Sequence, residues 1–146
     1  MPINATGTFQ ITNWDEQTTQ EFEGGAKRTR AVVTQTYTGD LEGTGTVEYQ
    51  MAYGRHGAVR FVGLETLDGA VGGNRGTVII QHVGQFVDGV AKSVWMFAEG
   101  TGTGALVDLG GEGTYHSIDP QNCNVAFSYH LGNEAAEVNR QRDGRE

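Results

Sequence analysis

The sequence contains few of the residues that stabilise small secreted scaffolds or bind nucleic acids. Its single cysteine, Cys123, cannot form an internal disulfide, so a disulfide-based framework is excluded. Lys and Arg total 10 against 18 Asp and Glu, which gives a formal net charge of −8. Phosphate binding needs clustered cations, and the short basic cluster at Lys27, Arg28 and Arg30 is typical of a solvated strand end. We therefore expect no nucleic-acid partner.

Long apolar runs and an export signal are also missing. No apolar stretch approaches the ~20 residues that a helix needs to span a bilayer. The first residues, MPINATGTF, lack the basic segment and the apolar run of a signal peptide. We therefore expect a cytoplasmic protein without a membrane partner.

Motifs for metal binding, phosphate binding and serine hydrolysis are absent as well. His56, His116 and His130 lie far apart in the sequence, and there is no His-x-His or Cys-x-x-Cys spacing that would hold a metal. The glycine-rich segments lack the Lys-Ser/Thr of a phosphate loop, and no Gly-x-Ser-x-Gly elbow occurs. The sequence therefore predicts neither a metal nor another cofactor.

What the chain has in abundance is glycine and β-forming residues. It has 23 glycines, and Val, Thr, Ile, Phe and Tyr dominate the segments between them. Apolar residues alternate with a period of two, which is typical of β-strands. The pattern predicts eight strands, at residues 5–14, 26–38, 41–53, 58–67, 76–87, 90–98, 100–115 and 124–131. The acidic segment 15–25 predicts a long loop, Asp88-Gly89 a tight hairpin, and the polar segment 132–146 a disordered tail.

The order of these strands predicts how the sheet closes. Eight short strands without a helix to cover an open sheet favour a barrel, because closure removes unpaired strand edges. We therefore predict an all-β, eight-stranded antiparallel closed β-barrel in one domain, residues 1–131. A barrel of this size is just wide enough to be filled by side chains or to hold one small ligand.

Four stretches of the sequence carry a family resemblance: TGDLEGTGTVEYQMAY, FVGLETLDGAVGGNRGT, IIQHVGQFVDGVAKSVW and GTGTGALVDLGGEGTY. Together they resemble DUF3224, a bacterial family of unknown function, over residues 5–131. That family is similar to the allene oxide cyclase-like barrels, which plant cyclases and dirigent proteins share. The resemblance implies a barrel that encloses a hydrophobic small molecule, that is often a homo-oligomer, and that in some members steers a cyclisation by shape. No catalytic residue of the plant enzymes matches this chain.

Strand alternation also predicts which side chains line the barrel. The inward positions carry aromatic rings and a few polar groups, which is the usual composition of a small-molecule pocket. The predicted ligand-binding residues are Tyr49, Met51, Phe61, Ile80, Phe86, Trp95, Phe97, Phe127 and Tyr129.

Two ionisable residues share these inward faces. Glu65 alternates with Phe61 and Leu67, and His82 lies between Ile80 and Phe86. Burial of a carboxyl disfavours its charged form, and an imidazole titrates near neutrality, so the two are candidates for general acid-base catalysis.

A structural explanation of this pair stays open. Glu65 would then pair with Arg60, with Arg75 or with a backbone donor at the rim, and His82 would be a hydrogen-bonded core residue. Three functions follow from these alternatives. The protein is a binding barrel, a cyclase or isomerase in which Glu65 or His82 moves a proton, or a filled barrel that acts through an oligomeric surface. In the last case Val62, Leu64 and Ile79 on the outer face would form the interface.

Overall fold

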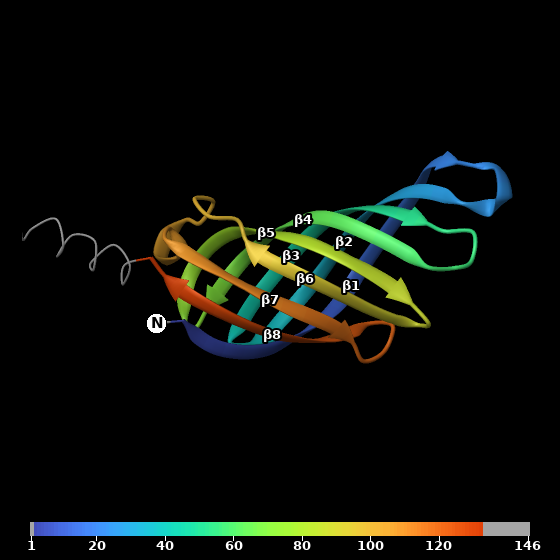
Figure 1. Cartoon of the computed structure of the whole chain (residues 1–146). Coiled ribbons are helices and arrows are strands. Elements are labelled where there is room, and N and C mark those ends of the chain that lie inside the picture. Colours follow the sequence, from blue (N-terminus) through green and yellow to red (C-terminus); the bar gives the residue numbers. More distant parts are fainter. Residues whose placement is uncertain (1, 133–146) are drawn as a thin grey trace, which may run out of the picture.

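The computed structural model describes residues 2–132, and these form one closed β-barrel (Figure 1). Its strands follow one another around the barrel in sequence order, and each is antiparallel to its neighbours. They are β1 (Ile3–Glu21), β2 (Lys27–Gly39), β3 (Leu41–Tyr53), β4 (Val59–Val71), β5 (Asn74–Val87), β6 (Val90–Phe97), β7 (Leu109–Ser117) and β8 (Asn122–Leu131). Two short 3-10 turns, η1 (Glu23–Gly25) and η2 (Gly104–Leu106), lie between strands.

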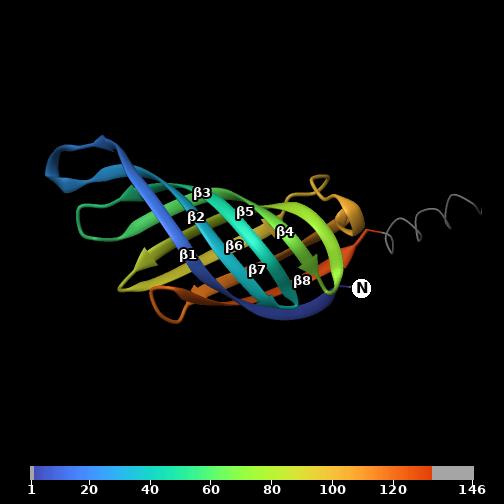
Figure 2. The same cartoon turned by 180° about the vertical axis from the view of Figure 1, so that it is seen from behind.

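Pairing of β1 with both β2 and β8 closes the sheet. The first half of β1 lies along β8, and nearly the whole of β1 lies along β2, as seen from both sides in Figures 1 and 2. Closure pairs the two terminal strands of the sheet with each other, and beyond Gln10 β1 pairs with β2 alone. The predicted eight-stranded antiparallel barrel is confirmed.

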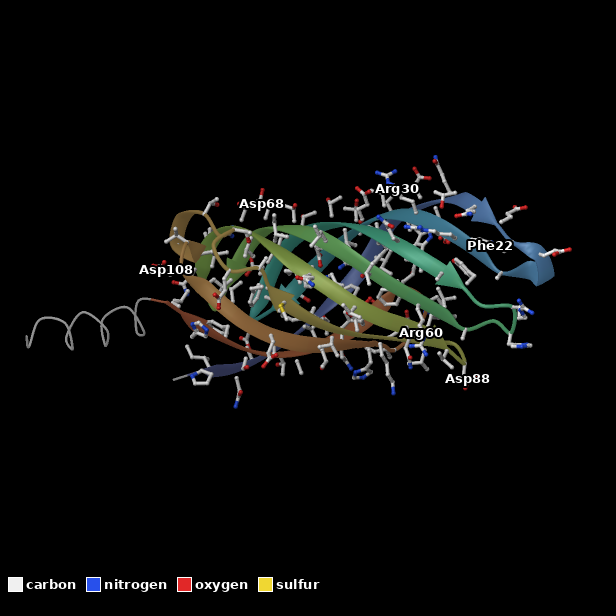
Figure 3. All side chains as sticks on the ribbon, turned by 45° about the horizontal axis from the view of Figure 1, so that its top comes forward. Phe22, Arg30, Arg60, Asp68, Asp88 and Asp108 are labelled. Atoms are coloured by element: carbon white, nitrogen blue, oxygen red, sulfur yellow. The ribbon has the colours of Figure 1, made fainter. Side chains whose placement is uncertain are left out.

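The barrel has two different ends. The β1–β2, β3–β4, β5–β6 and β7–β8 connections lie at one end, which we call the mouth end. The other three connections between strands lie at the opposite end, which we call the closed end. Figure 3 shows Phe22 and Asp88 at the mouth end and Asp108 at the closed end. Asp88 and Gly89 both have positive φ, 53° and 80°, as the predicted tight hairpin requires.

Alternation of side chains places the apolar residues inside, as the sequence predicts. In β4, Val59, Phe61, Glu65 and Leu67 are buried, while Arg60, Val62, Leu64 and Thr66 face outward. On the outer wall Val62 and Leu64 are 52% and 57% exposed.

The closed half of the barrel is filled with side chains. Trp95, Phe97 and Phe127 contact one another edge-on or tilted, with ring centroids 5.1–6.2 Å apart. Leu106 of η2 is completely buried, where it plugs the closed end against β5. Its approach depends on Gly76, because a Cβ at that position would lie 2.0 Å from the Thr103 carbonyl oxygen.

The predicted loop at residues 15–25 is wrong. β1 continues through this segment to Glu21 and pairs with β2 up to Glu21↔Lys27, with bulges at Ile11/Asn13 and Thr18/Gln20. The resulting β1–β2 hairpin projects beyond the other strands (Figures 1 and 2). Both faces of this ribbon are mostly exposed, so it needs no apolar alternation, and the acidic sequence does not prevent strand pairing.

Other strand boundaries also move. β4 and β5 extend to a two-residue turn at Gly72-Gly73, so the predicted turn at residues 69–74 is too long. Residues 100–108, predicted as the start of a strand, form a connection that contains η2, and β7 begins only at Leu109. The predicted tail at residues 132–146 lies, apart from Gly132, outside the described residues.

Candidate functional site

A cavity of about 400 Å³ occupies the mouth half of the barrel interior. Its rim is formed by Trp14 of β1, Phe86 and Gly89 at the β5–β6 hairpin, and Asp119 and Pro120 of the β7–β8 connection. The interior is therefore neither wholly filled nor wholly open.

The cavity wall is apolar and aromatic. Phe9, Val33, Met51 and Phe61 line it together with Val59, Ile11 and Ala91. Four of the nine predicted ligand-binding residues line this cavity: Tyr49, Met51, Phe61 and Phe86. Phe86 lies at the rim and is 42% exposed.

The other five predicted ligand-binding residues point into the barrel but lie in its filled half. They are Ile80, Trp95, Phe97, Phe127 and Tyr129, and all are buried. The cavity lining does not include them. Their inward orientation is confirmed, and their contact with a ligand stays a prediction.

Glu65 and His82 meet in the centre of the barrel. The Nε2 atom of His82 lies 2.6 Å from Oε1 of Glu65, and the two side chains are 1% and 0% exposed. Neither residue lines the cavity. The pair therefore lies behind the cavity floor, between the open and the filled halves.

The partners of Glu65 are not Arg60, Arg75 or a backbone donor at the rim, as the structural explanation of the pair predicted. Tyr37 Oη donates to the carboxylate at 2.8 and 2.9 Å, and Gln35 Nε2 donates to it at 3.0 Å. Arg60 instead contacts Gln85, and Arg75 lies near Glu42. Pairing of Glu65 with either arginine is wrong, because both arginines lie on the outer wall.

Two glycines make room for this cluster. A Cβ on Gly45 would lie 1.9 Å from Glu65 Oε2, and a Cβ on Gly63 would lie 2.7 Å from the Tyr49 ring. Side chains at these positions would displace the carboxylate or the ring. The absence of side chains at Gly45 and Gly63 thus allows polar groups to fill the barrel centre.

Tyr49 and Tyr115 form the part of the cavity floor that covers His82. Their hydroxyl oxygens are 3.0 Å apart, and both rings contact the imidazole edge-on at centroid distances of 5.8 and 5.7 Å. Burial raises the pKa of both phenols. The neighbouring phenols of Tyr115 and Tyr37 also raise the pKa of Tyr49. Both hydroxyls are therefore protonated near neutrality and can form hydrogen bonds at the cavity.

His82 has a second partner on its far side. Its Nδ1 atom lies 3.3 Å from Ser93 Oγ, which also donates to the Val94 carbonyl oxygen at 3.3 Å. Ser93 is directly opposite Tyr115 in the β6–β7 ladder. Both ring nitrogens of the buried histidine are therefore hydrogen-bonded.

Cys123 also lines the cavity, but its thiol is not activated. Burial, together with the charge of Asp119, raises the pKa of this thiol to about 12. A thiol in this state is protonated and a weak nucleophile near neutrality.

Glu16 organises one side of the mouth. It accepts hydrogen bonds from Trp14 Nε1 at 3.0 Å, from Thr29 Oγ1 at 2.6 Å and from the Tyr53 hydroxyl. Burial opposes ionisation of Glu16, but the hydrogen bonds from Thr29, Tyr53 and Trp14 together lower its pKa. Because Trp14 and Tyr53 both line the cavity, this carboxylate holds two rim side chains in place.

Sequence reasoning missed several members of the central cluster. Gln35, Tyr37, Ser93 and Tyr115 occupy inward positions and are buried. The signal was present for Gln35 and Ser93, because each is a polar residue between apolar residues of the inward face. The sequence could not show that these side chains meet in one cluster, because the cluster depends on the register of five strands.

Residues 2–132 contain neither a cluster of metal-binding side chains nor a membrane-spanning helix. Within that range no three His, Cys, Asp or Glu side chains gather in a way that could hold a metal ion. No helix in the same range is long and apolar enough to cross a membrane.

The fold and the site define a small closed β-barrel with a half-open interior and a buried Glu–His pair. The family model described as "Protein of unknown function (DUF3224)" matches residues 5–129, so the chain belongs to this family. The crystal structure of a DUF3224 protein of unknown function from Shewanella oneidensis MR-1 is similar, with a TM-score of 0.71 and 23% sequence identity. The match covers 90% of this chain and 98% of that chain, and at this identity it supports the fold alone. No curated protein matches the chain.

Proposed function

We propose that this barrel binds an apolar small molecule in the cavity of its mouth half. The observation that carries the proposal is the cavity itself, about 400 Å³ in volume and walled by Phe9, Met51 and Phe61. Ligand pockets in proteins typically measure ~300–1,000 Å³ and combine an apolar wall with a few polar groups. The polar groups here are Gln35, Tyr49 and Tyr115 at the floor.

The surroundings of the cavity favour a ligand without charge. Asp119 is the only ionisable carboxyl on the lining in residues 2–132, and it is exposed at the rim. Backbone and side-chain hydrogen bonds from Gln121 and Asn122 lower its pKa and occupy its oxygens. A charged ligand would have to give up its hydration in an apolar cavity without a partner of opposite charge.

The proposal can be tested with a neutral fluorescent probe, N-phenyl-1-naphthylamine, which becomes brighter in apolar surroundings. We expect saturable binding to the wild-type barrel and a loss of at least tenfold in affinity in Ala91→Trp, whose new side chain fills the cavity. Ala126→Trp adds the same ring to the exposed face of β8 and is the matched control. Equal affinity in the wild type and in both variants would place the probe outside the cavity and contradict the proposal.

The natural ligand can be sought directly. Native mass spectrometry of the protein purified from its own host should show a retained small molecule, and the mass should disappear in Ala91→Trp. A mass that Ala91→Trp retains would belong to another site.

A second candidate function is cyclisation or isomerisation of the bound molecule. The observation that favours it is that Tyr49 and Tyr115 contact both the cavity and His82, so that the buried Glu65–His82 pair is one layer away from a ligand. A proton from the pair would reach a substrate only through a hydroxyl of this layer. Loss of general acid-base catalysis typically lowers a rate by ~10²–10⁴. Turnover of a host-derived ligand that falls by this amount in Tyr115→Phe, with unchanged affinity, would support catalysis.

A further inference from the structure

The amide of Gln35 has a fixed orientation at the cavity floor. Its Nε2 atom donates to Glu65 Oε2 at 3.0 Å and to Tyr37 Oη at 2.9 Å. An ionised carboxylate can only accept hydrogen bonds, and the Tyr37 hydroxyl already gives its proton to Glu65. Both amide protons of Gln35 are therefore used, and rotation of the amide by 180° would set its carbonyl oxygen against the carboxylate.

Glu65 Oε2 is the hydrogen-bond acceptor that fixes the Gln35 amide. Tyr37 and Gln35 both donate to it, and His82 Nε2 lies at hydrogen-bond distance from Oε1. One proton held between His82 Nε2 and Glu65 Oε1 keeps the buried pair without net charge, and Glu65 Oε2 is an acceptor on either side of that proton. The hydroxyl of Ser93 donates to the Val94 carbonyl, which leaves Ser93 Oγ free to accept from His82 Nδ1–H.

One polar atom of Gln35 remains. Across residues 2–132 no hydrogen bond engages its Oε1, and within the same range no side-chain nitrogen or oxygen atom that is sealed from solvent lacks a partner. The Oε1 atom therefore reaches accessible space. Gln35 is 1% exposed and lines the cavity, so this space is the cavity.

We infer that the ligand carries a hydrogen-bond donor, a hydroxyl or an N–H group, at its buried end, and that Gln35 Oε1 accepts from it. This inference rests on the proposed binding function and adds the chemical class of the ligand. A hydroxyl fits the floor well, because its oxygen can also accept a hydrogen bond from the adjacent pair of phenols, Tyr49 and Tyr115. The Glu65–His82 pair then acts as a positioning element that fixes which end of the amide faces the ligand.

The test compares two probes in which a methyl group replaces the hydroxyl hydrogen. 2-Naphthol offers a donor, whereas 2-methoxynaphthalene keeps the ring and the oxygen but has none. We expect calorimetry to show that the wild-type barrel binds 2-naphthol about tenfold more tightly, which corresponds to about 1.4 kcal/mol. Methylation makes the probe more apolar, so a purely apolar cavity would show the opposite preference.

The variant Gln35→Met removes the acceptor and keeps the length of the side chain. We expect it to bind both probes with similar affinity, after circular dichroism has shown that it is folded. If the variant does not fold, the affinities of the two probes for the wild-type barrel still test the inference. A preference for 2-naphthol that persists in folded Gln35→Met would assign the acceptor to another group and overturn the inference.

The remaining outcomes separate the inference from the function on which it rests. Equal affinities in the wild type, or tighter binding of 2-methoxynaphthalene, would overturn the donor requirement and leave the binding function intact. Failure of both naphthalene probes and of N-phenyl-1-naphthylamine to bind would overturn the binding function, and the inference with it.

Discussion

The two halves of the barrel interior are built from the same strands but differ in how they are filled. In the closed half, Trp95, Phe97 and Phe127 pack together, and Leu106 enters from a loop to seal the end. In the mouth half, Trp14 of β1 and the β3–β4, β5–β6 and β7–β8 connections border a cavity. The closed half is thus packed with apolar side chains, whereas the mouth half keeps an apolar cavity.

A layer of polar groups separates the two halves. Glu65 and His82 are its ionisable members, and hydrogen bonds from Tyr37, Gln35 and Ser93 surround them. Buried ion pairs seldom add net stability relative to apolar residues of similar size. A layer like this one is better explained by specificity, because it fixes the orientation of polar atoms at the cavity floor.

The largest effect should come from breaking that layer. Glu65→Gln would leave His82 without its counter-charge and would place an amide NH2 against donors that now point at a carboxylate. Removal of one partner from a buried ion pair costs about 3–5 kcal/mol, and we expect a loss of this size in urea unfolding. Glu48→Gln is the matched control, because Glu48 forms a solvent-exposed pair with Arg30, and we expect little measurable change. Equal effects of the two substitutions would show that the central pair has no structural role.

The next effect should distinguish the filled half from the open half. Leu106→Ala would create a new void at the closed end and should cost about 2–5 kcal/mol of unfolding free energy. Met51→Ala would only enlarge an existing cavity, so its cost should fall at the lower end of that range. The measurement is urea unfolding of both variants. A larger loss in Met51→Ala would mean that the mouth half, and not the closed half, supplies the stabilising core.

The sequence predicted this architecture well where each strand buries one face. Alternation in β4 and β5 placed Glu65 and His82 inside, and Asp88-Gly89 marked its hairpin, because these signals are local. The extension of β1 could not be predicted in this way, since a ribbon with two exposed faces carries no alternation. The division of the interior into a filled and an open half could not be predicted either, because Leu106 comes from a turn whose residues show no strand pattern.

The candidate site was predictable only in part for a related reason. The contacts of Gln35 and Tyr37 with Glu65 cross from β2 to β4, past Gly45 of the intervening strand. They depend on register and on missing side chains, which are long-range properties. The sequence could therefore nominate the ionisable pair but not its hydrogen-bond partners or its distance from the cavity.

A third prediction compares the tyrosines at the floor with the one at the mouth. Burial raises the pKa of the floor residues Tyr49 and Tyr115 above the usual 10.0, as it does for Tyr37 behind the floor. Burial together with the hydrogen bond to Glu16 raises the pKa of Tyr53 to about 12. Raised folded-state values mean that this contribution to stability is present below about pH 10 and is lost as the pH rises further. Absorbance at 295 nm should therefore show the floor tyrosines ionising only as the circular dichroism of the barrel is lost. Tyr53→Phe should remove a step near pH 12, and early ionisation of the floor tyrosines in the folded protein would contradict their burial.

The smallest effect should come from Glu16, which organises the rim and is partly buried. Its folded-state pKa is lowered from 4.5, because hydrogen bonds from Thr29, Tyr53 and Trp14 outweigh the effect of its partial burial. A depressed folded value means that the stabilisation is present above about pH 4.5 and is lost as the pH falls through the folded pKa. Glu16→Gln should therefore be less stable than the wild type by under about 1 kcal/mol at neutral pH, and the difference should shrink in acid. Urea unfolding at several pH values measures this, and Trp14 fluorescence in a Trp95→Phe background reports the rim alone. A difference that stays constant down to pH values well below 4.5 would show that the carboxylate charge does not hold the mouth together.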